Sequence, residues 1–194
     1  DEGLTNLLCN YVEETYPSPI IYDFGCATGE YVNIFINRGL PITGIDGNPY
    51  IEDIPHCIVA DLTAPLNMVK ADFILCLEVG EHIPATYEKV FINNLVTTLK
   101  TGGTLALSWA IPGQGGYGHY NEKSNEYIIN TLAKHNLVHQ IDLTKKFREG
   151  IQDVTWLKTT LMIFKKIYRF LFCFLYRFLY RFLYRFFFLN QITK

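Results

Sequence analysis

The sequence lacks the features that mark secreted, disulfide-bonded proteins. Its 194 residues include only five cysteines, an odd number, and no two of them form a C-x-x-C pair. The chain opens at Asp1 without a charged segment followed by an apolar one, so no secretory signal is visible. Cysteines in this number and spacing favour reduced thiols over a disulfide framework. We therefore expect an intracellular protein, located in the cytoplasm.

Basic charge is also scarce in most of the chain. Residues 1–166 carry 12 basic and 19 acidic side chains, whereas residues 167–194 carry five basic side chains and no acidic one. An acidic body is a poor electrostatic partner for a phosphate backbone. A nucleic acid substrate is therefore not expected.

Short apolar runs alternate with helix-length segments over most of the chain. The runs expected to form strands are 19–24, 41–46, 56–62, 71–79, 104–111, 137–143 and 159–167, and the expected helices are 29–38, 84–100 and 123–135. Continuous apolar strands between helices indicate a mostly parallel sheet that is covered on both faces. The sequence therefore predicts a doubly wound α/β domain over residues 1–167.

Residues 168–194 form a low-complexity tail that differs from this body. Segment 168–188 repeats a four-residue unit and holds 12 of the 29 aromatic residues. As a transmembrane helix it would place Arg177 and Arg181 near the middle of the bilayer, where each costs about 2.5–3.5 kcal/mol. A helix lying on the membrane surface, with an aromatic face toward lipid, is favoured over a spanning one. The alternative is an expanded short repeat without a selected role.

The dinucleotide-binding fingerprint G-x-G-x-x-G is missing, although glycines follow the first expected strand. In "DFGCATG", three residues separate Gly25 from Gly29, and no glycine follows at the fingerprint distance. These glycines suit a tight turn that a ligand approaches closely. A dinucleotide pyrophosphate needs the missing spacing. The predicted ligand is therefore a nucleoside without a pyrophosphate, which argues against an NAD-dependent oxidoreductase.

Three aspartates stand at the ends of three successive expected strands. Asp23, beside the glycine turn, would repel phosphate and attract a cation. Asp46 ends the second strand, where a carboxylate accepts hydrogen bonds from ribose hydroxyls, and Asp61 closes the third. Open α/β sheets bind ligands in the crevice outside these strand ends. S-adenosylmethionine fits this set because it is a nucleoside that carries an ammonium and a sulfonium but no phosphate.

These motifs, together with "GIDGNPY", "VADL" and "LKTGGTLALS", resemble class I S-adenosylmethionine-dependent methyltransferases over roughly residues 15–167. The resemblance implies a Rossmann-like seven-stranded sheet with an antiparallel pair of strands at its edge. It places Asp23 near the methionine amino group, Asp46 at the ribose and Asp61 beside the adenine. The cofactor-binding residues that it implies are Asp23, Gly25, Cys26, Gly29, Asp46, Gly47, Asp61, Leu62, Leu77 and Glu78.

Two later stretches hold groups that suit methyl transfer to a hydroxyl or amine, which requires an aligned acceptor and removal of a proton. Glu81 and His82 in "CLEVGEHIP", and His119 in the glycine-rich loop 112–120, are the predicted catalytic residues. With Glu78 they make two carboxylates and two imidazoles, a set for a divalent metal. Mg²⁺ or Mn²⁺ is expected if the carboxylates dominate, and Zn²⁺ if the imidazoles do. The pattern is similar to one that holds a metal in small-RNA 2′-O-methyltransferases and ubiquinone-pathway O-methyltransferases.

The glycines of loop 112–120 predict a lid that orders over the acceptor and shields it from water. Trp109, Tyr117 and Tyr120 are expected at an aromatic edge of the acceptor pocket. The predicted function is transfer of a methyl group to a hydroxyl or amine of a small molecule. The alternative is a non-catalytic module of the same fold that its tail holds at a membrane or a partner.

Overall fold

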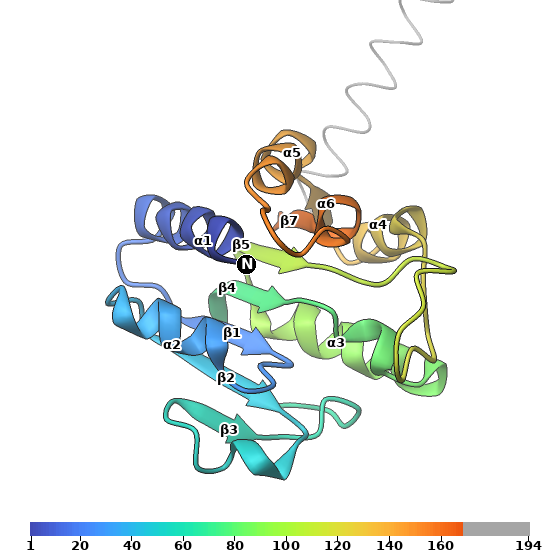
Figure 1. Ribbon diagram of the computed structural model, residues 1–194, viewed down its shortest axis with the longest axis horizontal. Helices are drawn as coiled ribbons and strands as arrows, with labels where there is room; N and C mark the ends of the chain where they lie inside the picture. Colours follow the sequence, from blue (N-terminus) through green and yellow to red (C-terminus); the bar gives the residue numbers. More distant parts are fainter. Residues whose placement is uncertain (169–194) are drawn as a thin grey trace, which may run out of the picture.

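The computed structural model describes residues 1–168, which are built around one central sheet (Figure 1). This sheet has seven strands. The strands are β1 (Ile21–Phe24), β2 (Ile42–Asp46), β3 (Cys57–Val59), β4 (Ala71–Cys76), β5 (Leu99–Leu107), β6 (Leu137–His139) and β7 (Met162–Lys166). Their order in the sheet is β3-β2-β1-β4-β5-β7-β6. The first five strands pair in parallel, and β7 runs antiparallel to both β5 and β6. The predicted mostly parallel sheet with an antiparallel pair at its edge is confirmed.

Helices cover both faces of this sheet, as the doubly wound prediction requires. They are α1 (Glu2–Thr15), α2 (Glu30–Asn37), α3 (Glu88–Thr98), α4 (Asn125–Ala133), α5 (Ile141–Glu149) and α6 (Leu157–Thr160). Helices α1, α2 and α5 bury apolar side chains against Phe73 and Ile163 on one face. On the other face, α3 and α4 pack with Ile74 and Phe164. Successive strand residues thus serve opposite cores, which is why these strands read as continuous apolar runs.

The sequence prediction missed three helices: α1, α5 and the short α6, which overlaps the start of the expected strand 159–167. Helix α1 begins after Asp1, whose Oδ1 accepts a hydrogen bond from the Leu4 N–H at 2.9 Å as an N-cap. The segment 137–143, expected as a strand, stops pairing at His139 and continues as α5. Helix α5 buries only Thr144 and Phe147, so its apolar periodicity is too sparse to separate it from the strand before it.

Of the aromatic and arginine-rich tail, only the first residue is among the described residues. The helix that was expected to lie on the membrane surface is therefore outside the described part of the chain. The domain boundary at residue 167 stays a prediction for the same reason. Within residues 1–168, no helix combines the length and the apolar character that crossing a bilayer requires.

Candidate functional site

A cavity of about 430 Å³ opens at the carboxyl ends of the first strands. Its wall comes from the glycine turn after β1, the end of β2, the segment after β3 and the segment after β4. Six of the ten predicted cofactor residues line it: Gly25, Asp46, Gly47, Asp61, Leu62 and Glu78. The predicted residues that are not among its lining residues, within the described chain, are Asp23, Cys26, Gly29 and Leu77.

The turn after β1 needs glycine at its first position. Gly25 has a φ of +83°, in the left-handed region. A Cβ at this position would lie 2.3 Å from a methyl carbon of Val79, so the Val79 side chain occupies the space that glycine leaves. The Gly25 and Cys26 N–H groups both donate to the carbonyl of Ile45, at 2.7 and 3.2 Å. The turn is thereby tied to β2 while one side of its backbone faces the cavity.

Asp46 holds this turn and the loop that follows β2. Its Oδ2 accepts a hydrogen bond from the Ala27 N–H at 2.9 Å, and its Oδ1 accepts one from the Asn48 N–H at 2.9 Å. Ala27 is one of the few non-glycine residues with a positive φ, at +47°. The carboxylate of Asp46 therefore sets the shape of the backbone on both sides of itself.

Asp61, in the segment after β3, lines the same cavity. Its Oδ1 accepts hydrogen bonds from the Thr63 N–H at 2.8 Å and the Thr63 hydroxyl at 2.6 Å. These two bonds hold the pKa of the Asp61 carboxyl below its usual value. Asp61 is thus ionised and its orientation is fixed, which suits a group that accepts a hydrogen bond from a ligand.

Asp23 lies in β1, with only 3% of its surface exposed. Burial raises the pKa of its carboxyl from 3.8 to about 7, and the negative charge of Asp46 adds to the rise. A buried carboxyl next to another acid favours its neutral form until a cation arrives. The charge of Asp46 is therefore close enough to Asp23 to raise its pKa, although Asp23 itself does not line the cavity.

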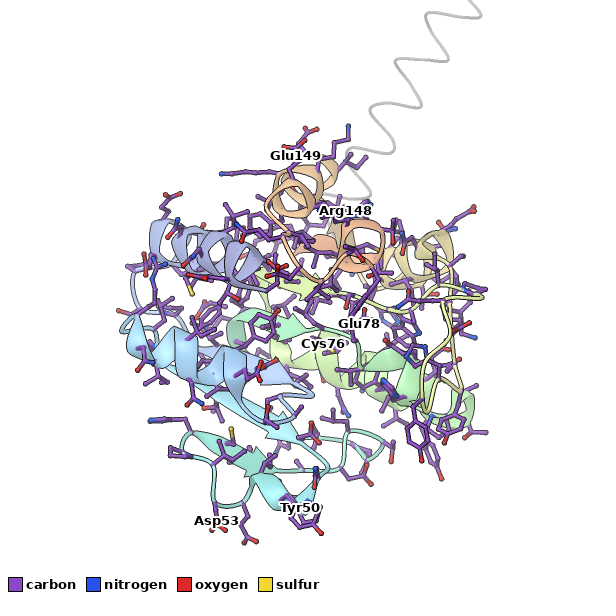
Figure 2. All side chains as sticks on the ribbon, in the orientation of Figure 1. Tyr50, Asp53, Cys76, Glu78, Arg148 and Glu149 are labelled. Atoms are coloured by element: carbon purple, nitrogen blue, oxygen red, sulfur yellow. The ribbon has the colours of Figure 1, made fainter. Side chains whose placement is uncertain are left out.

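Glu78 lies just after the end of β4 (Figure 2), and its backbone is strained. Its φ is +55°, which costs a non-glycine residue about 1–3 kcal/mol. The N–H of Glu78 donates to the Ser108 hydroxyl at 2.7 Å, which helps to hold this backbone. Its Oε2 accepts a hydrogen bond from Gln114 at 3.2 Å, whereas its buried Oε1 has no partner among residues 1–168. Glu78 lines the cavity from this conformation.

A second cavity, of about 560 Å³, shares Glu78 with the first. Its other lining residues are Gln114, Gly115, Gly116, His119 and Trp156. The loop 112–120 therefore borders a cavity, as predicted. The prediction that Trp109, Tyr117 and Tyr120 form an aromatic edge of this cavity is wrong. Trp109 is fully buried in the core, and the side chains of Tyr117 and Tyr120 project into solvent. The aromatic wall is Trp156, which no sequence motif indicated.

Glu81, His82 and His119 come together between the two cavities. One ligand atom from each lies within 4.8 Å of the others, and Glu78 is not part of this set. Glu81 is fully buried, and neither of its carboxylate oxygens has a hydrogen-bond partner in the described chain. Burial raises the pKa of its carboxyl from 4.5 to about 7. The predicted catalytic residues are thus assembled, although they come from segments almost 40 residues apart in the sequence.

Both imidazoles are oriented by an oxygen on their Nδ1 side. His82 Nδ1 lies 3.1 Å from the Gly118 carbonyl oxygen, and His119 Nδ1 lies 3.3 Å from Glu122 Oε1. A carbonyl and a carboxylate can only accept, so each Nδ1 carries the hydrogen. In the neutral rings, Nε2 then holds a free lone pair. The two side chains are set to accept a proton or to bind a cation.

Comparison with known proteins agrees with this geometry. A profile of the family described as methyltransferase domain matches residues 22–107, which run from β1 to the end of β5. A search of the curated proteins finds no match.

Several solved structures share the fold. The sugar N-methyltransferase KedS8 from a Streptoalloteichus species has a TM-score of 0.63 and 14% identity, over 86% of this chain and 87% of that one. The 1,6-didemethyltoxoflavin-N1-methyltransferase of Burkholderia thailandensis, solved with S-adenosylhomocysteine, has a TM-score of 0.60 and 13% identity, over 87% and 80%. The S-adenosylmethionine-bound amino pentose methyltransferase CalS10 of Micromonospora echinaspora has a TM-score of 0.60 and 14% identity, over 84% and 89%.

At such low identity these structures show the fold alone. Residues 22–107 match the methyltransferase domain family, and the chain has the class I, Rossmann-like fold of S-adenosylmethionine-dependent methyltransferases.

Proposed function

We propose that the first cavity binds S-adenosylmethionine and that its methyl group passes to a hydroxyl or amine of a small molecule in the second cavity. The observation that carries this proposal is that the two cavities share the wall formed by Glu78. A methyl donor and an acceptor must be held in line and close together. Two adjoining cavities of about 430 and 560 Å³ suit one nucleoside and one small acceptor.

The cofactor roles follow from the donors and acceptors around the first cavity. Asp46 would accept hydrogen bonds from the ribose hydroxyls, and Asp61 one from the adenine amino group. Asp23 would pair with the methionine ammonium once it has lost its proton. The turn from Gly25 to Gly29 leaves room for close approach of the cofactor. Ligands that carry phosphates, such as NAD, would bring negative charge against these acids and be repelled.

His82 and His119 are the proposed proton acceptors, with Glu81 beside them. His82 lines the first cavity and His119 lines the second, so the pair spans the path between donor and acceptor. An Nε2 lone pair near the acceptor would take the proton that a hydroxyl or amine loses as it is methylated. The sugar and toxoflavin methyltransferases named above are consistent with acceptors of small size.

We also propose that Glu81, His82 and His119 hold a divalent metal. The residues fit, because a fully buried carboxylate without a partner and two imidazoles with free Nε2 atoms form a donor set suited to Zn²⁺ or Mn²⁺. Oxygen acceptors on the far ring nitrogens orient ligating histidines in this way. When bound, such an ion would lower the pKa of an acceptor hydroxyl.

Calorimetry tests the cofactor proposal directly. S-adenosylmethionine and S-adenosylhomocysteine should bind, and NAD should not. Transfer of a labelled methyl group to a panel of amino sugars, heteroaromatic amines and alcohols then tests turnover. Failure of S-adenosylmethionine to bind would refute the proposal, whereas binding without transfer to any acceptor would favour the non-catalytic alternative.

Elemental analysis tests the metal independently of activity. Protein purified without chelators should retain close to one equivalent of Zn²⁺ or Mn²⁺, and His119→Ala should lose it. His56→Ala, at a histidine outside the cluster, serves as the matched control and should retain the metal. Equal metal content in all three proteins would contradict the metal site.

A further inference from the structure

Glu122 lines neither cavity, yet its one carboxylate contacts three groups of the acceptor side. Its Oε2 accepts a hydrogen bond from the Gly113 N–H at 2.7 Å. Its Oε1 accepts one from the Gly115 N–H at 2.8 Å and faces His119 Nδ1 at 3.3 Å. We infer that Glu122 is a positioning residue, which shapes the wall of the second cavity and turns His119 Nε2 toward the site. The effect of Glu122 on catalysis rests on the proposed function, whereas its contacts with the loop and with His119 do not depend on that function.

The backbone on both sides of Glu122 is held by hydrogen bonds to buried segments. The preceding residue, Asn121, is 3% exposed, and its N–H donates to the Glu81 carbonyl at 3.0 Å. The Asn121 carbonyl accepts a hydrogen bond from the buried indole of Trp109 at 2.6 Å. On the other side, the N–H of Lys123 donates to the Ala110 carbonyl at 2.9 Å. The carboxylate is therefore presented from backbone that the core holds on both sides.

The loop that Glu122 contacts has little side-chain packing to hold it. Gly113 and Gly115 have φ values of +87° and +70°, and a Cβ at either position would meet no atom within 4 Å. Charged acceptors make hydrogen bonds roughly twice as strong as neutral ones. A fixed anion thus orders a loose segment that lines the second cavity.

The same carboxylate selects the tautomer of His119. Because the carboxylate only accepts, the ring hydrogen sits on Nδ1 and the lone pair on Nε2. Gly116 makes room for this ring position, since a Cβ there would lie 2.4 Å from Nε2. Glu122 therefore combines two tasks, placing the cavity wall and presenting the nitrogen that the proposed chemistry uses.

The variant Glu122→Gln tests these two roles while it keeps the size of the side chain. Glutamine has nearly the same size, but its amide nitrogen cannot accept, so the three contacts cannot all persist. We expect amide hydrogen exchange at Gly113 and Gly115 to rise at least about tenfold. We also expect ¹⁵N–¹H NMR of the His119 ring to show loss of the Nδ1–H tautomer as the dominant form. Glu126→Gln, at an exposed carboxylate of α4, is the matched control and should change neither readout.

Affinity for S-adenosylmethionine should stay within about twofold in Glu122→Gln, because Glu122 does not line the first cavity. An unchanged His119 tautomer together with unchanged glycine exchange would overturn the inference. Faster exchange throughout the chain would also overturn it, because it would show a general structural role. Should Glu122→Gln fail to fold, Glu122→Asp keeps an acceptor-only side chain and should retain the Nδ1–H tautomer. Both NMR readouts need neither cofactor nor acceptor. They are recorded on protein treated with a chelator, because a metal ion on Nε2 would itself keep the hydrogen on Nδ1.

Discussion

Affinity for S-adenosylmethionine should increase as pH rises from 5.5 to 7.5, because Asp23 must lose its proton to pair with the methionine ammonium. Burial and the charge of Asp46 place the pKa of Asp23 at about 7 in the unliganded protein. Below that pH the carboxyl is mostly neutral and attracts the ammonium weakly. Pairing with the cation lowers the pKa, so binding releases a proton.

The size of this effect follows from the fraction of Asp23 that is ionised. With a pKa of about 7, about one molecule in eleven is ionised at pH 6 and about three in four at pH 7.5. The dissociation constant should therefore be about eightfold higher at pH 6 than at pH 7.5. Above about pH 7.7–8.0 the cofactor's α-amino group itself deprotonates, so the comparison ends at pH 7.5.

The same shift has the opposite sign for the stability of the unliganded protein. The pKa of Asp23 is raised on folding from 3.8, so between pH 4 and 7 the folded state binds more protons than the unfolded state. The contribution of Asp23 to the free energy of unfolding therefore falls by up to about 4 kcal/mol as the pH rises through that window. Asp23→Asn should therefore stabilise the unliganded protein at pH 7.5 while weakening cofactor binding.

Calorimetry in two buffers of different ionisation enthalpy measures both the affinity and the released proton. Asp23→Asn should show a flat profile from pH 5.5 to 7.5. Methylthioadenosine, which lacks the amino acid portion, should bind the unaltered protein with a flat profile as well. The reasoning fails if the variant keeps the pH dependence, or if the unaltered protein shows none.

Two substitutions probe the rest of the cofactor cavity. Asp46→Ala should weaken S-adenosylmethionine binding by about 1–3 kcal/mol through lost hydrogen bonds, whereas the exposed Asp53→Ala should leave calorimetric affinity unchanged. Gly25→Ala should lower the melting midpoint and abolish binding, because its Cβ would collide with Val79. Gly39→Ala has a similar positive φ but open space around it, so thermal unfolding should show only a conformational cost of about 1–2 kcal/mol. Equal losses at Gly25 and Gly39 would contradict the steric argument.

The acceptor side was the harder part to predict. "SWAIPGQGG" contains both Ser108 and Gln114, but no spacing rule shows that one holds the strained backbone of Glu78 and the other its carboxylate. Trp156 enters the second cavity from a segment near the end of the domain, and Trp109 is drawn into the core instead. Such contacts depend on how loops pack across the sheet, and pairwise packing is not encoded in local patterns.

The sequence by itself determined the parallel sheet, the glycine turn and the three strand-end acids, because strand periodicity and strand ends are local properties and parallel strands bring their carboxyl ends to one edge. The sequence pattern also grouped Glu81, His82 and His119, but only the tertiary structure decided that Glu78 stays outside this cluster and that Glu122 reaches back to the glycine-rich loop. It also decided the protonation of Asp23, since the pKa of a carboxyl depends on burial and neighbouring charge that only the folded chain creates.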